Sequence, residues 1–547
     1  MEEPSRDNET TGRLAMIMKH GAPRAMVLAA LLAGTAPAAL YAATPADTLV
    51  VADAIDDIVS IDPHEAFEFS GVDLNNNLYD SLVELDPTKP GELVPGLAES
   101  WSVADDGVTY SFKMKPGITF SSGNPVTAED AAGSLRRVVK LNKTPAFILT
   151  QFGFTPENVD QMITFDGDTV TLKTDKPYAP TFVYNCLTAG VAGIVDMKTV
   201  MANEVDGDMG NAWLKANSAG TGAYVLKSFK ANEGYILEAR AGHWRGDAKV
   251  KNVLMRHVPE GATQRLLLEK GDIDIAREMT PTDIAGVSGN ADITVQNDVG
   301  GQIYYLAMNQ KKPELANPKV LEAMRWAVDY KGMTDTLLKG QWVVHQAFLP
   351  LGFLGALEET PYSLDLEKAK AALAESGVTL PLEVSLTVRN NQERMDIAQS
   401  IQNTFGQIGI NVTLDVGDGK QVLEKYRARQ HDITVQTWGP DYPDPHTNAS
   451  TFAMNPNNAD EPAATGFLAW RTAWDPGALH AMTEAAVAEP DADKRKAMYE
   501  EIQRTHRDTS AFLLMFQQAR QDAMRANVTG FFAGGATDSA SYWTVTK

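Results

Sequence analysis

Three short stretches in the C-terminal half alternate between apolar and polar residues, and this alternation predicts β-strands. They cover residues 383–388, 410–416 and 432–436. Between the first two, five apolar residues recur at helical spacing: Met395, Ala398, Ile401, Phe405 and Ile408. A period of two is typical of half-buried strands, and a period near 3.6 is typical of amphipathic helices. The order strand, helix, strand predicts an α/β region whose strands share a parallel sheet.

Residues 75–219 show a different pattern, in which hairpins mix with single helices. The turn dipeptide Asp106-Gly107 separates two alternating runs and predicts a hairpin. Thr127, followed three residues later by Asp130, predicts a capped helix start. This mixture indicates an inserted α+β domain that is distinct from the later α/β region.

Further elements are predicted on either side of this insert. Strands are expected at 48–52 and 303–309, and a hairpin is expected within 220–239. Asn317-Pro318 marks the start of a helix, since a capping residue precedes proline in the first turn. A second helix is expected over 366–376, ending before Gly377.

The N-terminus has the pattern of an export signal. The basic residues Lys19 and Arg24 precede an apolar run at 25–33, and small residues follow through Ala43. This order predicts a secretory signal peptide within residues 1–43, with cleavage near Ala42 or Ala43. The run is too short to span a membrane, and no later apolar run reaches that length. Translation that begins at Met16 or Met18 would fit the signal better than a start at Met1.

A single cysteine, Cys186, lies far from the expected cleavage point. A lipid-anchored product needs a cysteine at that point, so the exported protein is expected to be soluble and free of a membrane anchor. One cysteine cannot form an intrachain disulfide. We therefore expect Cys186 to act as a small buried hydrophobic residue.

Composition narrows the choice of partners. The 547 residues carry a formal net charge of −23, which argues against nucleic acid and against an anionic membrane surface. A hydrophobic content of 44% and a charged content of 22% are ordinary for a globular protein. This length allows several domains.

The loop after the strand at 432–436 carries the first candidate binding residue, Asp441. Trp438-Gly439-Pro440 ends the strand, because proline cannot donate to a sheet ladder. Asp441 and Tyr442 follow in a proline-stiffened loop. Ligands of open α/β sheets bind outside the carboxyl ends of the strands, so this acid beside aromatic residues is well placed to bind a ligand.

Arg389 is the second candidate, at the end of the strand predicted over 383–388. If the strands share one parallel sheet, Arg389 and Asp441 project toward the same edge. A guanidinium and a carboxylate there suit a ligand that carries both charges. Spacing alone explains both residues equally well as surface ion pairs or turn hydrogen bonds. Phe67 and Glu65 lie near another strand end, where they either line a site or cap the next helix.

Motifs of catalysis and of metal or phosphate binding are absent from the sequence. It contains no H-E-x-x-H and no G-x-S-x-G motif, and its histidines are not paired at metal-ligand spacing. The segment Gly417-Asp418-Gly419-Lys420 lacks the hydroxyl residue of a phosphate-binding loop, and 491–495 lacks the glycine of a calcium loop. We expect no cofactor and no enzymatic activity, with an exported hydrolase as the alternative from another class.

A series of further motifs resembles one known family. Its members are the extracytoplasmic solute-binding proteins of ABC importers, the family with dipeptide-, oligopeptide- and nickel-binding members. The matching segments are residues 78–83, 95–101, 106–112, 117–120, 127–130, 220–224, 243–244, 271–274 and 312–329. Each segment is weak by itself, but their shared order is specific.

The resemblance implies a fold of two α/β lobes joined by hinge strands, with an extra α+β domain inserted in the first lobe. The expected division is a first lobe of 44–74, 220–308 and 510–547, an insert of 75–219 and a second lobe of 309–509. The implied function is to capture a ligand between closing lobes in the periplasm and deliver it to a membrane permease of the ABC type. A monomer is expected.

The resemblance also assigns roles to residues. Asp441 matches the aspartate that binds the α-amino group in peptide-binding members, and Arg389 is similar to the arginine that binds the carboxylate of dipeptides. Trp438 and Gly439 match the ligand-lining loop, and we expect Trp438, Tyr442 and Phe67 to cover apolar groups of the ligand. A short peptide is the expected ligand. The alternatives are an opine or amino-acid conjugate, an oligosaccharide or a metal chelate, and a receptor or chaperone role stays open, because fold does not fix the ligand.

Overall fold

An eleven-stranded mixed sheet runs through the molecule. The computed structural model describes residues 44–547 except 87–88, 90–91, 462 and 535–539, so the expected signal peptide lies outside the described residues. The strand order is β15-β14-β16-β12-β17-β11-β1-β10-β9-β8, and β13 pairs with β17 off this path. The predicted α/β class is therefore confirmed.

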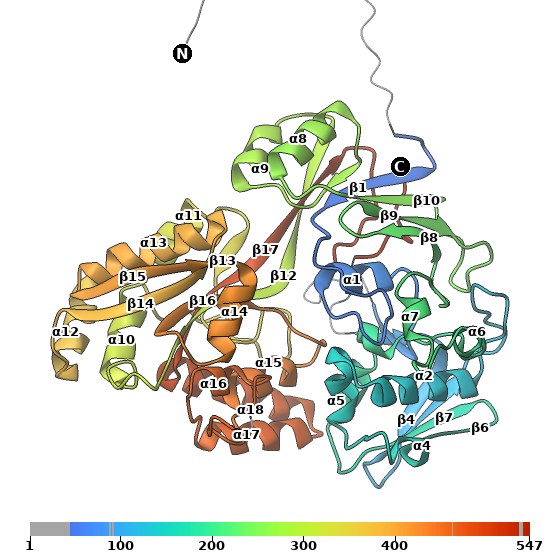
Figure 1. The fold of residues 1–547 in the computed structure, drawn as a ribbon, viewed down its shortest axis with the longest axis horizontal. Coiled ribbons are helices and arrows are strands. Elements are labelled where there is room, and N and C mark those ends of the chain that lie inside the picture. The colour runs from blue at the N-terminus through green and yellow to red at the C-terminus, as the bar shows by residue number, and fades with distance from the viewer. Residues whose placement is uncertain (1–43, 87–88, 90–91, 462, 535–539) are drawn as a thin grey trace, which may run out of the picture. The chain divides into compact units, whose positions relative to one another are not determined.

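The sheet has two halves that two long strands connect (Figure 1). One half contains β1 (Thr48–Asp53), β8 (Tyr224–Lys230), β9 (Gly234–Ala239), β10 (Asn252–His257) and β11 (Ile275–Ala276). The other contains β13 (Trp342–Val344), β14 (Leu382–Arg389), β15 (Ile410–Gly417) and β16 (Ile433–Trp438). The connecting strands are β12 (Ile293–Met308) and β17 (Phe512–Arg525), which pair antiparallel along most of their length.

The predicted strand–helix–strand unit is present. β14, α13 (Gln392–Gly406) and β15 follow one another, and β14 pairs parallel with both β15 and β16. The apolar face of α13, including Ile401 and Phe405, is buried in the same cluster as Leu386 of β14. Because the three strands are parallel, their carboxyl ends lie at one edge of the sheet.

Eight further helices belong to this second half of the molecule. They are α10 (Pro318–Trp326), α11 (Tyr330–Asp335), α12 (Leu366–Ser376), α14 (Gly419–Arg427), α15 (His446–Ala453), α16 (Leu468–Arg471), α17 (Ala478–Ala488) and α18 (Ala492–Thr509). Asn317 caps α10, and Gly377 ends α12 with a φ of 69°, as the sequence predicts. Asp418 forms a capping box at α14, which gives the segment 417–420 a structural role.

The segment after β1 contains a separate antiparallel sheet, in the order β4-β5-β7-β6. Its strands are β4 (Ala98–Val103), β5 (Thr109–Met114), β6 (Ile163–Asp166) and β7 (Thr169–Lys173), and a ribbon of β2 (Val83–Leu85) and β3 (Leu93–Pro95) precedes them. The predicted Asp106-Gly107 hairpin and the Thr127 capping box of α2 (Ala128–Leu141) are both present. Cys186 is buried, as predicted.

Short helices complete the first half. They are α1 (Phe69–Asn75), α3 (Phe147–Thr150), α4 (Val159–Met162), α5 (Pro180–Cys186), α6 (Met197–Ala202), α7 (Asn211–Leu214), α8 (Gly261–Lys270) and α9 (Pro281–Val287). Buried apolar residues from Leu82 to Ile194 form one hydrophobic cluster, which Tyr442 and Val487 join from the other half of the molecule.

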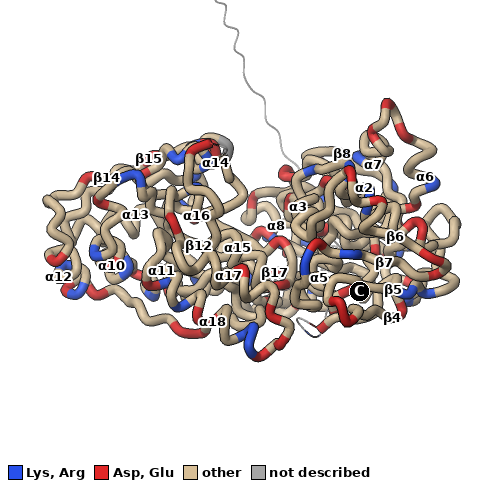
Figure 2. Tube along the Cα trace, turned by 90° about the horizontal axis from the view of Figure 1, so that it is seen from below, with Lys and Arg blue, Asp and Glu red and all other residues tan. Residues whose placement is uncertain are grey.

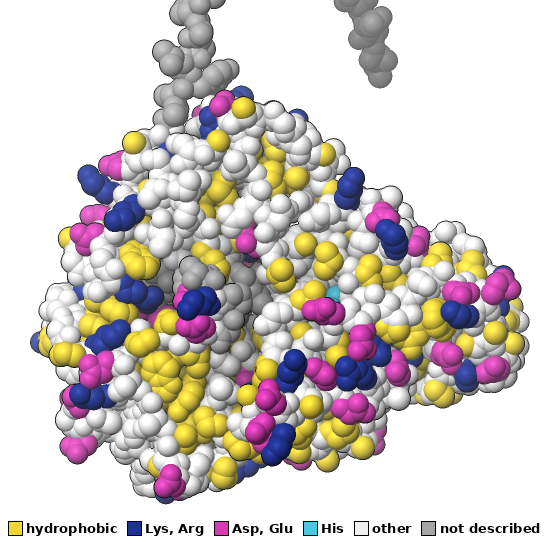
Figure 3. Space-filling model, turned by 180° about the vertical axis from the view of Figure 1, so that it is seen from behind, with side chains coloured by type: hydrophobic (Ala, Val, Ile, Leu, Met, Phe, Trp, Pro, Cys, Tyr) yellow, Lys and Arg dark blue, Asp and Glu magenta, His cyan; other side chains and the backbone are white. Residues whose placement is uncertain are grey.

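Charges of both signs are interspersed over the chain. Figure 2 shows acidic and basic residues dispersed along the trace, and Figure 3 shows charged side chains scattered between apolar ones on the face opposite Figure 1. Within the described part of the chain, no helix has the length and apolar character needed to cross a membrane.

Candidate functional site

A cavity of about 830 Å³ lies where the two halves of the sheet meet the connecting strands. Asp53 ends β1, Glu278 follows β11, Asn391 follows β14, and Thr437 lies near the end of β16; all four line the cavity. The connecting strands contribute Gln302, Gln518 and Arg520, among others. The site thus lies at the carboxyl ends of parallel strands, where α/β folds bind ligands.

One wall, which we call the first wall, consists of Asp53, Asp73, Arg277 and Glu278. The Arg277 guanidinium lies 2.5 Å from Asp73 and 3.2 Å from Asp53, and its Nε lies 3.5 Å from Asp522. Although burial opposes it, these carboxylates raise the pKa of Arg277 above its ordinary value. Arg277 therefore stays charged and holds the carboxylates of the wall in place.

Glu278 is the unusual carboxyl of the first wall. Desolvation in the cavity and the neighbouring Asp53 carboxylate together raise the pKa of Glu278 to about 8. Desolvation also raises the pKa of Asp53. Two neighbouring carboxyl groups cannot both ionise easily, so Glu278 is largely protonated at neutral pH.

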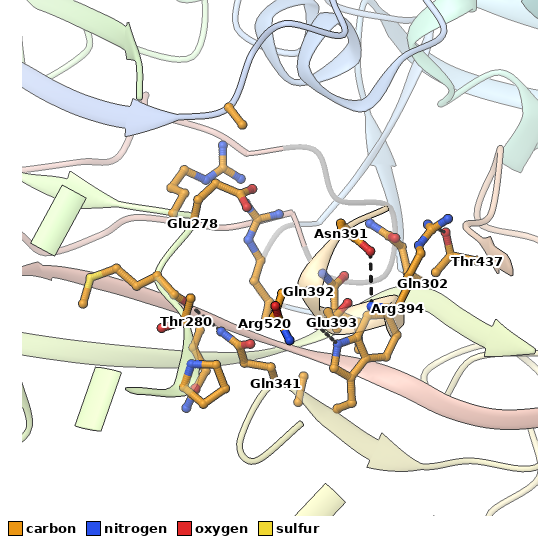
Figure 4. Close-up of a pocket in the computed structure, with 18 of the residues that line it drawn as sticks. Glu278, Thr280, Gln302, Gln341, Asn391, Gln392, Glu393, Arg394, Thr437 and Arg520 are labelled. Carbon is orange, nitrogen blue, oxygen red and sulfur yellow. Dashed lines mark hydrogen bonds between the residues drawn. The ribbon is translucent and has the colours of Figure 1, made fainter. Parts of the chain in front are cut away.

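The opposite wall, which we call the second wall, consists of Tyr304, Trp342, Glu393, Arg394 and Thr437. Glu393 accepts hydrogen bonds from the Tyr304 hydroxyl at 2.7 Å and from Trp342 Nε1 at 2.8 Å. Arg394 donates from Nη2 to Thr437 Oγ1 at 2.9 Å. Figure 4 shows Asn391, Gln392, Glu393 and Arg394 along this side of the cavity, with Glu278 and Thr280 on the other.

Two contacts join the sides of the cavity. The Gln341 amide donates to the Met279 carbonyl at 2.5 Å. The ring of Phe69, at the start of α1, lies against Gly439; a Cβ on Gly439 would be 2.9 Å from Phe69 Cζ and 3.7 Å from Gln302 Cγ. Since real Cβ atoms do not approach so closely, a larger residue at this position would require the exposed Phe69 ring to shift.

Asp441, the central sequence prediction, lies in the loop just beyond Gly439. Its backbone N–H donates to Thr447 Oγ1 at 2.9 Å. Its half-buried carboxylate has no hydrogen bond and no ion pair to any described residue, and desolvation raises the pKa of Asp441 to about 7. The group is therefore a carboxyl without a partner among the described residues, in the loop after β16, and it is not part of the cavity lining.

Trp438 and Gly439 do not line the cavity, and Trp438 packs against the buried cluster that contains Tyr305 and Phe452. Trp438 is half-buried, and its Nε1 has no hydrogen-bond partner among the described residues. Gly439 lies next to Phe69 and Gln302, and both of these residues line the cavity. Thr437, one residue before Trp438, is the member of this strand end that lines the cavity itself.

Arg389 lies at the predicted sheet edge but opens on a different space. It is exposed and lines a smaller cavity of about 380 Å³ with Asn390, residues 416–419 and Gln421. Its guanidinium carbon lies 3.1 Å from where a Cβ on Gly419 would be. The structure therefore does not bring Arg389 into the larger cavity; its side chain lies beside Gly419 at the start of α14 instead.

Tyr442 and Phe67 pack against other aromatic side chains. Only 2% of Tyr442 is exposed, and its ring centroid lies 5.9 Å from that of Phe182 in α5. The ring of Phe67 packs edge-on against Phe147 at 5.9 Å. Neither residue lines the larger cavity in this conformation. The aromatic residues that do line it are Phe69, Tyr304 and Trp342.

Several lining residues escaped the sequence analysis. The same strand-end rule that selected Arg389 and Asp441 also selects Asp53 after β1 and Arg277 and Glu278 after β11. β11 has only two residues, Ile275 and Ala276, so its end is hard to locate in the sequence. Arg394 gave no signal, since one arginine in the first turn of an amphipathic helix is usually a surface residue.

The described residues contain no group of three or more His, Cys, Asp or Glu side chains that could hold a metal ion. A family model for bacterial extracellular solute-binding proteins, family 5, matches residues 92–460, which is most of the chain. The protein belongs to this family.

Curated relatives match over most of the chain. A probable D,D-dipeptide-binding periplasmic protein of Escherichia coli is 27% identical over 93% of this chain and 95% of its own length. The dipeptide-binding protein of the same organism is 24% identical over 83% of this chain and 86% of its own length. The nickel-binding periplasmic protein of Escherichia coli is 27% identical over 80% of this chain and 83% of its own length.

Solved structures share the family 5 fold. A periplasmic binding protein from Helicobacter pylori in complex with the peptide STSA has a TM-score of 0.76 and 20% identity, and the alignment covers 91% of this chain and 98% of that one. A dipeptide-binding protein from a Pseudoalteromonas species in complex with Met-Leu has the same TM-score and identity, covering 91% and 100%. These likenesses confirm the predicted solute-binding fold.

Proposed function

We propose that this protein is the periplasmic substrate-binding component of an ABC importer, and that it captures a short peptide for delivery to a membrane permease. Family membership supports the transport role, and the printed names of several relatives support a peptide and a periplasmic location. Binding a solute requires no bond cleavage. The sequence carries no catalytic motif, and the cavity needs only complementary contacts to its ligand.

The observation that carries the peptide assignment is the unpaired carboxylate of Asp441. A desolvated carboxylate with no partner among the described residues is unfavourable in the free protein, and a ligand ammonium supplies the missing charge. In this proposal Asp441 binds the α-amino group, while Trp438, Gly439 and Phe69 border it. The carboxylate end has two candidates, Arg389 from the sequence and Arg394 in the larger cavity.

Thermal unfolding of the protein, purified after export, tests the proposal. The panel contains L,L- and D,D-dipeptides, tripeptides, N-acetylated dipeptides, sugars, opines and metal chelates. A ligand at about a hundredfold its Kd adds about 2.7 kcal/mol to the free energy of unfolding and raises the midpoint visibly. A shift with free peptides that acetylation abolishes supports the proposal. Turnover of a labelled peptide during incubation would instead identify a hydrolase.

A non-peptide ligand is the second candidate, and the amide-rich lining supports it. Gln302, Gln341, Gln392 and Gln518 line the cavity together with the Trp342 ring. Amide side chains that donate and accept hydrogen bonds beside an aromatic ring suit a polyhydroxylated ligand or an amino-acid conjugate. A midpoint shift from the sugars or opines in the panel, with none from peptides, would move the assignment to this class.

A further inference from the structure

At the first wall of the larger cavity, acidic groups outnumber basic ones. Together with the adjacent part of β17, the wall brings four carboxyl groups of described residues around two guanidinium groups. The acids are Asp53, Asp73, Glu278 and Asp522, and the bases are Arg277 and Arg520. With every group charged, this cluster keeps a net negative charge, which a cation from outside the protein would reduce.

Three of these acids are compensated within the protein. Asp53 lies 3.2 Å and Asp73 2.5 Å from the guanidinium of Arg277. Asp522 lies 3.1 Å from Arg520 and 3.5 Å from Arg277. All three aspartates are buried. They therefore hold the two arginines in place, and a ligand is not needed to balance their charges.

Glu278 is the acid that the arginines leave uncompensated. Its side chain lines the cavity, is exposed, and forms no ion pair with a described residue. Desolvation by the cavity walls and the Asp53 carboxylate raise the pKa of Glu278 to about 8, although Arg520 and Arg277 act in the opposite direction. A carboxyl group in this environment becomes ionised when a further positive charge arrives beside it.

The position of Glu278 suits a side chain of the ligand. Because β11 pairs parallel with β1, Glu278 lies at the same edge of the sheet as Asp53. Figure 4 shows Glu278 on the side of the cavity opposite Glu393 and Arg394. Asp441, which we assign to the α-amino group, belongs to the other half of the sheet. The cavity of about 830 Å³ is in the upper part of the range of about 300–1,000 Å³ for ligand pockets, so it has room for side chains.

We propose that Glu278, beside Asp53, binds a cationic side chain of the ligand, so that the larger cavity prefers short peptides that contain lysine. This inference rests on the proposed function. The ammonium of the lysine side chain favours the carboxylate form of Glu278, so binding at neutral pH releases the proton of Glu278 to the solvent. One positive charge enters the cavity and one leaves it, and the net charge of the first wall stays the same.

The test is calorimetric titration at pH 7 with dipeptides of alanine and lysine, in both sequence orders, and with the same dipeptides in which norleucine replaces lysine. Norleucine keeps the length of the lysine side chain and removes its amine. We expect the wild-type protein to bind the lysine peptides at least about tenfold more tightly. Titration in two buffers of different ionisation enthalpy counts the protons released. Since Asp441 contributes equally to all four peptides, the lysine peptides should release about one proton more, from Glu278.

Two variants locate the effect. Glu278→Gln has the shape of the protonated side chain but cannot ionise, so the fold should be kept while the preference for lysine and the extra proton release both disappear. Asp272→Asn is the matched control. Asp272 is an exposed acid before β11, at the opposite end of this short strand, and it does not line the cavity. Its variant loses the same charge and should keep both the preference and the proton release.

Equal affinity of the wild-type protein for lysine and norleucine peptides overturns the inference without any variant. A preference for lysine without extra proton release overturns it too, because the amine would then bind elsewhere. The same holds for a Glu278→Gln protein that keeps the preference and for an Asp272→Asn protein that loses it, which would indicate a general effect of charge. These results leave the peptide assignment intact, whereas silence toward all four peptides overturns both that assignment and this inference.

Discussion

Two aspartates of one loop, three residues apart, have opposite environments. Asp444 is fully buried, and Arg495 of α18 donates to both of its oxygens, at 2.8 and 2.7 Å. The backbone N–H of His446 donates to it as well, at 2.9 Å. Asp441 is half-buried, has no side-chain partner among the described residues, and has a pKa raised to about 7 by desolvation.

The difference separates a charge that stabilises the fold from a charge that is available to a ligand. The charge of Asp444 is compensated within the protein, so the free and bound states both contain the pair. The charge of Asp441 has no compensation from a described residue, so it makes the free protein less stable; in the proposed complex the ligand ammonium would supply the missing charge. A proline-rich loop holds both residues, which lets the paired one fix the position of the unpaired one.

The largest expected effect is the loss of the Asp444–Arg495 pair. Asp444→Asn leaves the Arg495 guanidinium buried without a counter-ion, and breaking a buried pair in this way costs about 3–5 kcal/mol of unfolding free energy. Urea unfolding at pH 7 measures it. Arg495→Gln in the same chain should recover part of the loss. A decrease below about 1 kcal/mol would show that the pair does not hold the loop.

The next effect is on binding. Asp441→Asn removes the charge while keeping the shape, and we expect dipeptide affinity to fall by about 2–4 kcal/mol, thirtyfold to a thousandfold. Titration calorimetry measures it. Undiminished affinity in Asp441→Asn would remove the ammonium assignment.

A smaller effect is the dependence of affinity on pH. Because the pKa of Asp441 is about 7 in the free protein and a bound ammonium lowers it, a proton competes with the ligand as the pH falls. We expect affinity to decrease by up to about fiftyfold from pH 7 to pH 5, a range in which the peptide amine, whose pKa is near 8, stays mostly charged. The Asp441→Asn variant should show a much flatter profile. A wild-type profile no steeper than that of the variant contradicts the assignment.

The smallest effect is on the stability of the free protein. A carboxyl whose folded pKa is raised favours folding below its unfolded pKa near 4, and this contribution is lost as the pH rises through 7. Asp441→Asn should therefore raise the free energy of unfolding by about 1–2 kcal/mol at pH 8, with the gain vanishing toward pH 4, since the half-buried group keeps some contact with water. A loss of stability at pH 8 would mean that Asp441 has a structural partner.

The strands and the helix of the second half of the sheet were predicted well from the sequence, because their local hydrophobic periodicity determines their secondary structure. The residues of β14, α13 and β15 each show one clear period, and their boundaries were found within a few residues. β12 was predicted only from Ile303, while the strand begins at Ile293. Its first part is polar and half-exposed, and its long pairing with β17 extends it where the local pattern does not.

The site was predicted less completely, because it depends on contacts between distant segments. Asp441 follows from its place at a strand end, but its contrast with Asp444 depends on Arg495, which lies 51 residues further along. Arg394 and Arg389 look alike in the sequence. Only the packing of Arg389 against Gly419 and the anchoring of Arg394 to Thr437 distinguish them.

The contact between Tyr442 and Phe182 has a consequence for exchanging parts between family members. These rings lie in one core although 260 residues separate them, and the Ala179 N–H donates to the Val487 carbonyl beside them at 3.0 Å. Consider a chimaera in which the region of the antiparallel sheet β4-β5-β7-β6 comes from a relative. Its side chains would then face the loop of Tyr442 without having evolved to pack against it. The chimaera should fold well only when the loop that contains Tyr442 and helix α17 are taken from the same donor. Family members should therefore exchange this domain successfully only together with these two contacting segments.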